Sequence, residues 1–333
     1  MKITHIILLA IIAVIISGCI SNPSDNKVIQ EETPLKIGIA TSPFPALLFV
    51  AKEKGFFEEE GLNVEFVEFT AGKFALQAFL AGSLDLTVSG EVPVMYSTLS
   101  GNDFYVITQL VERTKNEVRI VARKDGDLNE PQAYFQAKKR KLATSFGGGP
   151  EFYTHEFLEK YNITDIELVN QKPEDMPAAL ASGTVDAVAV FDPFAYFAEQ
   201  KLDGDAVVFK DGDLYSEMFV LTAHKDWVRA HPEETEKILR SLLKASQFIE
   251  QNPEESKNIV MPYSKLDRDT LDVIWSNFVF KPVLNDLLPE YLEAEAEWAK
   301  ETGKVSADTV VPDFREYIYT DSLKRVKPEY VTI

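Results

Sequence analysis

The feature that most constrains the fold is a pattern that the chain carries twice. The first copy reads "LAGSLDLTVSGEVP" from Leu80, and the second reads "ASGTVDAVAVFDP" from Ala181. Each copy has a glycine, an apolar residue, an Asp, a mostly apolar run of four or five residues, and then an acidic residue close to a proline. The offset from Gly82 to Gly183 is 101 residues. Such a repeat predicts two structural units built on the same plan.

Each copy predicts a helix that ends at a glycine in the left-handed conformation, an Asp in the turn, and a buried strand. The acidic residue and the proline then begin another helix. Ligands of open α/β sheets bind outside the carboxyl ends of the strands. Glu91 and Asp192 therefore lie where a ligand would be, and two copies imply two lobes that share one cleft. Chance similarity between two helix–strand units is the alternative.

Strands and helices alternate through the first hundred residues. Leu35–Ala40 is an apolar run typical of a buried strand, and the segments after it predict helix and strand in turn. These segments are Pro45–Gly55 (helix), Gly61–Phe69 (strand), Lys73–Leu80 (helix), Leu84–Val88 (strand) and Pro93–Ser100 (helix). The alternation predicts an α/β protein with mixed, mostly parallel sheets and helices on both faces.

A triple-glycine turn, Gly147 to Gly149, follows a predicted strand and precedes a predicted helix over Pro150–Tyr161. Backbone amides at the start of such a helix form a ready anion site. Gly72 and Lys73 offer an equivalent helix start in the first lobe. A flexible strand–helix connection is the alternative interpretation.

Beyond residue 225 the pattern changes to helices without strands. The predicted helices are 232–252, 266–280 and 288–303. Ile238, Leu242 and Ala245 fall on one helical face, so we expect these helices to pack against the first lobe. Trp275 and Trp298 are then core residues rather than part of a cofactor site.

The amino terminus resembles a lipoprotein signal. The apolar run Ile6–Ile16 is too short to span a bilayer, which needs about 20 apolar residues. It is followed by "ISGC", which resembles the lipobox of prokaryotic lipoproteins and would make Cys19 the lipidated first residue. Residues 20–33 are polar and predict a tether. An ordinary signal peptide with a coincidental cysteine is the alternative.

The composition and the motifs of the chain exclude several classes of function. The chain has 34 Lys and Arg against 53 Asp and Glu, a net charge of −19, so nucleic acid is not an expected partner. A single cysteine excludes disulfides and thiolate metal clusters. His155, His224 and His231 lack a common metal-ligand spacing, and no G-x-S-x-G, H-E-x-x-H or phosphate-binding G-x-x-x-x-G-K-[ST] motif occurs. We expect no cofactor, no metal and no catalytic residues.

The run from Ser42 to Pro93 closely resembles the start of extracellular solute-binding proteins of ABC importers for nitrate, sulfonates, taurine, bicarbonate and thiamine-precursor pyrimidines. The segment "ALASGTVDAVAVFDP" is similar to the family's second-lobe segment that ends in an acid–proline pair. The resemblance spans roughly residues 35–260. It departs at "FQAKKRKLATS", where the family usually has an Asp-Leu-Lys-Gly-Lys turn. That departure leaves the start of lobe two uncertain.

The resemblance implies the two-lobed type II periplasmic-binding-protein fold, with two hinge strands near Val118–Arg123 and Phe219–His224. It predicts a signal peptide (1–18), a lipidated tether (19–34), lobe one (35–119 and 224–320) and lobe two (120–223). The expected protein is a monomer on the extracytoplasmic face of the membrane. It captures a sulfonate-, taurine- or aminopyrimidine-like solute by closing, and delivers it to a membrane permease.

The same fold also implies rivals, namely enzymes of pyrimidine or menaquinone synthesis, and a ligand sensor. For a binding protein, the glycine-rich helix starts would hold an anionic or carbonyl end of the ligand. Glu91 and Asp192 would accept hydrogen bonds from a cationic end, or else cap helices. The predicted ligand contacts are Ser42, Phe44, Gly72, Lys73, Gly90, Glu91, Ser145, Gly147, Gly148, Gly149 and Asp192.

Overall fold

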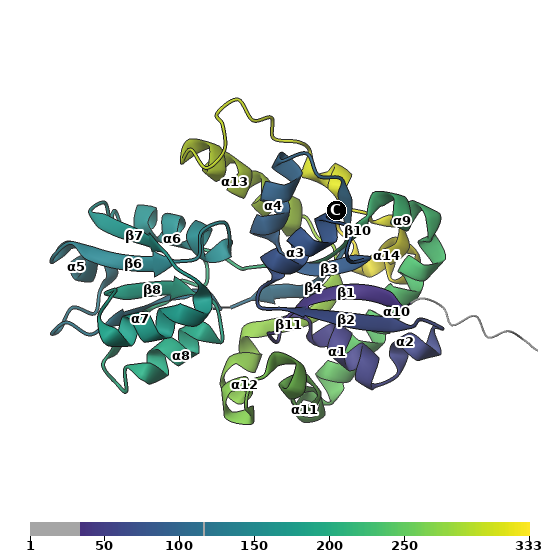
Figure 1. Ribbon diagram of the computed structural model, residues 1–333, viewed down its shortest axis with the longest axis horizontal. Helices are drawn as coiled ribbons and strands as arrows, with labels where there is room; N and C mark the ends of the chain where they lie inside the picture. The colour runs from purple at the N-terminus through teal and green to yellow at the C-terminus, as the bar shows by residue number, and fades with distance from the viewer. Residues whose placement is uncertain (1–33, 116) are drawn as a thin grey trace, which may run out of the picture. The chain divides into compact units, whose positions relative to one another are not determined.

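The computed structural model describes residues 34–115 and 117–333, and Pro34–Ile333 is one compact unit (Figure 1). The expected signal peptide, Cys19 and almost all of the tether lie outside the described residues. One sheet has the order β11-β4-β10-β3-β1-β2, and a second has the order β7-β6-β8-β5-β9. The first sheet consists of β1 (Leu35–Ala40), β2 (Val64–Phe69), β3 (Leu86–Gly90), β4 (Phe104–Thr114), β10 (Phe219–His224) and β11 (Phe278–Val283). The second consists of β5 (Arg119–Arg123), β6 (Arg140–Thr144), β7 (Ile166–Asn170), β8 (Ala187–Val190) and β9 (Ala206–Phe209).

Both sheets are mixed. β1 pairs in parallel with β2 and β3, and β6 pairs in parallel with β7 and β8. The antiparallel pairs involve β10 in the first sheet, β5 in the second, and the edge strand β11. The mixed α/β class that the sequence predicts is confirmed.

Helices cover both faces of each sheet. Neighbouring strand residues enter opposite cores: Val220 packs with α3 (Gly72–Leu80), α4 (Glu91–Leu99) and α13 (Leu287–Glu301), and Leu221 packs with α1 (Ala46–Glu53) and α10 (Pro232–Gln251). The second sheet lies between α5 (Pro131–Gln136) with α6 (Gly149–Lys160) and α7 (Met176–Ser182) with α8 (Phe194–Lys201). The remaining helices are α2 (Phe56–Glu59), α9 (Lys225–Ala230), α11 (Pro253–Ser264), α12 (Arg268–Ile274) and α14 (Asp321–Val326).

The sequence repeat is a repeat of structure. The two repeat glycines have left-handed φ angles of 77° and 76°. Asp85 Oδ2 accepts the backbone N–H of Lys36 at 2.8 Å, and Asp186 Oδ2 accepts that of Lys141 at the same distance. Each Asp thereby fixes the turn before its own strand to the start of the neighbouring parallel strand, β1 in one sheet and β6 in the other.

The chain passes from the first sheet to the second between β4 and β5, and returns between β9 and β10. Both passages lie just before the strands near which the sequence places them. β10 begins at Phe219 and belongs to the first sheet. A division of the chain by sheets therefore ends lobe two before Phe219, whereas the sequence-based division ends it at residue 223.

The expectation of helices alone beyond residue 225 is wrong. Phe278–Val283 form β11, which pairs antiparallel with β4. Phe278 and Phe280 lie in the core with residues of α1 and α10. The alternation of buried and more exposed residues that is typical of a strand is therefore present, but it directly follows a segment with a helical pattern. The predicted helix 232–252 is confirmed as α10. Within residues 34–115 and 117–333, no helix has the length and apolar character that crossing a membrane requires.

Candidate functional site

A cavity of about 60 Å³ lies where segments of both sheets meet. Its lining includes the ends of β1, β3 and β6 and the first residues of α3, α4 and α6. The volume is enough for a few water molecules or a small chemical group, because one ordered water needs roughly 10–15 Å³. Strand ends and helix starts therefore line a small space.

The cavity contains seven of the eleven predicted ligand contacts. These are Ser42, Phe44, Gly72, Lys73, Gly90, Ser145 and Gly148. The other four, Glu91, Gly147, Gly149 and Asp192, do not line it. The sequence therefore locates the edge of the sheets at which the cavity forms, and its two acidic residues lie outside the lining.

The start of α3 reaches the cavity because Gly72 lies close to β3. A Cβ atom on Gly72 would be 3.0 Å from the Cα of Ser89 and 3.1 Å from the carbonyl oxygen of Val88. Lys73 follows, and its Nζ lies 3.2 Å from Ser145 Oγ at the end of β6. Burial lowers the pKa of Lys73, against the opposing effect of the Glu174 and Glu151 carboxylates. A half-buried cation thus connects the strand ends of the two sheets.

The triple-glycine turn does not present three free amides. The N–H of Gly147 donates to Glu151 Oε2 at 2.7 Å, so the turn satisfies it internally. Gly148 lines the cavity, whereas Gly149 packs against Tyr215 and Glu217. The starts of α3 and α6, which the sequence predicts to be equivalent, hold different places in the two sheets. α6 follows β6 as α1 follows β1, whereas α3 follows β2.

Glu91 does not face the cavity. It begins α4 and is 1 % exposed. Its Oε2 accepts the backbone N–H of Met218 at 2.8 Å, and its Oε1 accepts the hydroxyl of Tyr215. Burial raises the pKa of Glu91 to about 7, although both hydrogen bonds oppose that rise. The carboxyl group belongs to an internal network and does not line the cavity.

Asp192 is also occupied by the protein itself. It is fully buried, its Oδ2 lies 2.9 Å from Arg119 Nη1, and the same oxygen accepts the side-chain amide of Asn277 at 2.8 Å. Its Oδ1 accepts the backbone N–H of Tyr196 at 3.3 Å, near the start of α8. The capping alternative therefore describes Asp192 better than ligand binding does. The bond to Asn277 also connects β8 with the segment before β11.

One acidic residue of the cavity is absent from the contacts that the sequence predicts. Glu217 lies in the passage before β10, is 6 % exposed and lines the cavity. Its Oε2 is buried, and the neighbouring Glu117 carboxyl donates a hydrogen bond to Glu217 while it carries a proton. The available signal was weak: an acidic residue two positions before a predicted hinge strand.

Four glutamates form a buried acid cluster beside the cavity: Glu91, Glu117, Glu217 and Glu295. Burial is the largest cause that raises the pKa of each, and repulsion from neighbouring carboxylates raises the pKa of Glu117, Glu217 and Glu295 further. Burial and the charge of Glu91 also raise the pKa of Tyr215. The cluster is therefore sensitive to any cation or proton that reaches it.

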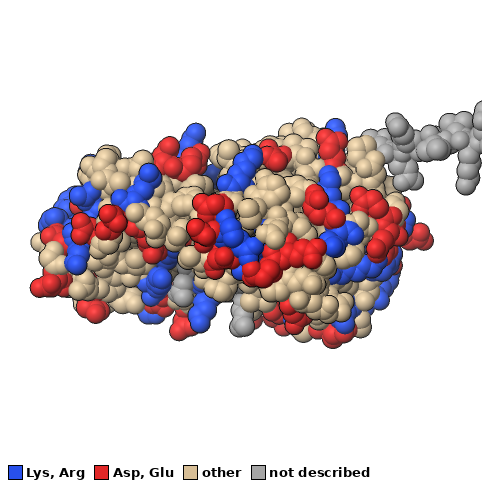
Figure 2. Space-filling model, turned by 90° about the horizontal axis from the view of Figure 1, so that it is seen from below, with Lys and Arg blue, Asp and Glu red and all other residues tan. Residues whose placement is uncertain are grey.

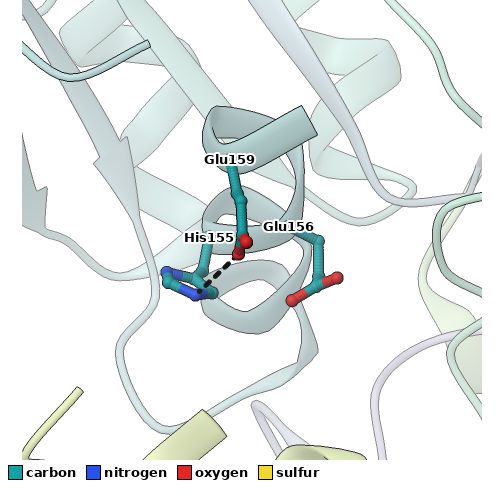
Figure 3. A group of neighbouring side chains, drawn as sticks. All are labelled: His155, Glu156 and Glu159. Carbon is teal, nitrogen blue, oxygen red and sulfur yellow. Dashed lines mark ion pairs between the residues drawn. The ribbon is translucent and has the colours of Figure 1, made fainter. Parts of the chain in front are cut away.

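One group of possible metal ligands lies elsewhere. Figure 3 shows His155 and Glu159 turned toward each other on α6, with Glu156 beside them; His155 Nε2 is 3.6 Å from Glu159 Oε2. All three side chains belong to one helix and are partly or fully exposed, and none lines the cavity. The face drawn in Figure 2 shows acidic and basic side chains interspersed, without a broad basic patch.

Comparisons place the chain among known proteins. It matches the NMT1-like family over residues 29–261. It is 25 % identical to a protein of Bacillus subtilis (strain 168) whose name describes an aliphatic sulfonates-binding protein, over 99 % of this chain and 98 % of that one. It is 23 % identical to the nitrate/nitrite binding protein NrtA of Nostoc sp. (strain PCC 7120 / SAG 25.82 / UTEX 2576), over 79 % of this chain and 69 % of that one.

A solved structure shows the same fold. The periplasmic aliphatic sulphonate binding protein SsuA from Escherichia coli superposes with a TM-score of 0.74, at 22 % identity, over 86 % of this chain and 98 % of that one. The fold is that of the periplasmic binding proteins, as the sequence predicts.

Proposed function

Since the chain belongs to the NMT1-like family, we propose that it is the extracytoplasmic solute-binding component of an ABC importer. It captures a small solute of the sulfonate, taurine or aminopyrimidine type between its two lobes and delivers that solute to a membrane permease, without turnover. We take the first sheet with its helices as lobe one, and the second sheet as lobe two. Cys19 carries the lipid anchor, and the protein acts as a monomer.

The observation that carries the proposal is the composition of the cavity. Ser42, Lys73 and Gly90 come from segments of the first sheet, and Ser145 and Gly148 from the second. A ligand in this cavity contacts both lobes at once. It therefore favours the arrangement in which the lobes meet, which is the basis of capture by hinge closure.

The two passages between the sheets suit a hinge. They are single connections, one before β5 and one before β10, so a change of backbone angles there moves one sheet relative to the other. The names of the relatives describe binding proteins for sulfonates and for nitrate. Both are small anions, and the cationic Lys73 with the first amides of α3 gives such an anion a place to bind.

The test is a thermal-shift screen of the purified protein against sulfonates, taurine, nitrate, bicarbonate and aminopyrimidines. A ligand at 100 times its dissociation constant should stabilise the protein by about 2.7 kcal/mol. Lys73→Met should lose that stabilisation. Lys265→Met, which removes a surface ion pair with Glu68, should retain it. Turnover of a substrate by the protein alone, or a full response from Lys73→Met, would contradict the proposal.

A further inference from the structure

We propose that Glu217 selects the solute by receiving a positively charged amino group, so that the ligand is a small zwitterion with its acidic group at Lys73. This inference rests on the proposed function and assigns the chemistry of the same cavity. The cationic end of the ligand then contacts Glu217, which lies in the passage between the lobes, and not Glu91 or Asp192 of the sequence repeat.

The charge of the cavity lining matches a zwitterion. Among the described residues that line the cavity, Lys73 and Glu217 are the charged ones. The other lining side chains are uncharged, and several are aromatic: Phe44, Phe191, Phe194 and Phe219. The rings of Phe44 and Phe219 stack with centroids 3.7 Å apart. A ligand with one negative group, one positive group and a short apolar linker matches this lining in charge and in polarity.

Two glycines make room for the Glu217 carboxylate. A Cβ atom on Gly90 would be 3.1 Å from Glu217 Oε1, and one on Gly149 would be 3.0 Å from it. Gly90 precedes α4 in lobe one and Gly149 begins α6 in lobe two. A side chain at either position would crowd the carboxylate, so one glycine from each lobe keeps its place open.

The described residues give Glu217 no charged donor. Glu217 Oε2 is buried, and the partner of Glu217 is the Glu117 carboxyl, which donates a hydrogen bond only while it carries a proton. A neutral acid offsets less of the cost of a buried carboxylate than a charged N–H group does. The ammonium group of a ligand in the cavity supplies such a donor.

A metal ion is a poorer occupant than an ammonium group. Among residues 34–115 and 117–333, the three acidic or histidine side chains whose ligand atoms lie within 4.8 Å of one another are those on α6, away from the cavity. The four glutamates of the buried acid cluster do not meet that condition. Their arrangement suits a single directional N–H donor better than a coordination shell.

The experiment compares matched compounds that differ only in the amine. Taurine is paired with ethanesulfonate and β-alanine with propionate, and binding is measured by isothermal titration calorimetry. We expect the amine-bearing member to bind about 10- to 100-fold more tightly, the ratio that corresponds to roughly 1.5–3 kcal/mol for a charged hydrogen bond. Glu217→Gln should reduce this ratio to near one and leave ethanesulfonate affinity unchanged or improved.

Glu91→Gln is the matched control. It removes another acid of the same cluster that does not line the cavity, and it should keep the preference for the amine. Equal affinity of wild-type protein for taurine and ethanesulfonate, or an amine preference that survives Glu217→Gln, would overturn the inference and leave solute binding intact. If no compound of these pairs or of the wider screen binds, the proposed function fails as well.

Discussion

Replacement of Glu91 by Gln tests whether the buried acid cluster holds protons in the folded protein. The pKa of Glu91 is raised from its ordinary 4.5 to about 7, chiefly by burial. The folded protein therefore binds this proton more tightly than the unfolded chain does. Stability from this group is fully present below pH 4.5 and is lost as pH rises through about 7.

The size of the effect follows from the pKa. One pKa unit corresponds to about 1.36 kcal/mol, so a pKa of about 7 against 4.5 represents about 3 kcal/mol between pH 4.5 and pH 8. Unfolding of a compact unit of roughly 300 residues carries about 2.1 cal/mol/K of entropy per residue, so this free energy corresponds to about 5 °C in Tm.

The assay is Tm by calorimetry from pH 5 to pH 8 without ligand. Gln still accepts a hydrogen bond from the Met218 amide, and it cannot become charged. Glu91→Gln should therefore gain stability relative to wild type as the pH rises from 5 to 8. The exposed Glu65→Gln serves as the control for removing one charge. Parallel profiles for wild type and Glu91→Gln would refute the reasoning.

Three further predictions concern the scaffold and the anchor. Gly149→Ala should cost about 1–3 kcal/mol in urea unfolding, because its Cβ would overlap the Tyr215 hydroxyl, whereas the nearest atom to a Cβ on Gly148 is 3.7 Å away and Gly148→Ala should be nearly neutral. Asp192→Ala breaks a buried ion pair and should cost about 3–5 kcal/mol; a loss under 1 kcal/mol would show that the pair is dispensable. Cys19→Ala should abolish lipidation and leave the fold intact, and mass spectrometry showing another amino terminus in the native protein would contradict the anchor.

Local signals in the sequence were sufficient for much of the fold. A left-handed glycine, an Asp in the following turn and an apolar strand are determined by a few neighbouring residues, and the two copies of this pattern fold alike. The Asp85–Lys36 and Asp186–Lys141 bonds show that the repeated Asp has the same task in each copy.

The hydrogen-bond and ion-pair partners of a buried side chain could not be predicted in the same way. The side-chain partner of Glu91 is Tyr215, 124 residues away, and an ion-pair partner of Asp192 is Arg119, 73 residues before it in the chain. Nothing near either acid indicates that the protein itself satisfies it. β11 was not predicted for a related reason. Its strand pattern is short, and its pairing partner β4 lies far away in the sequence.

Solution X-ray scattering shows whether the protein captures its solute by closing two lobes. The measurement compares the radius of gyration of the protein alone with that of the protein saturated with the tightest ligand from the thermal-shift screen. Closure of the lobes predicts a smaller radius of gyration with ligand and an unchanged helix content by circular dichroism. Identical scattering curves at full saturation would contradict a closing cleft.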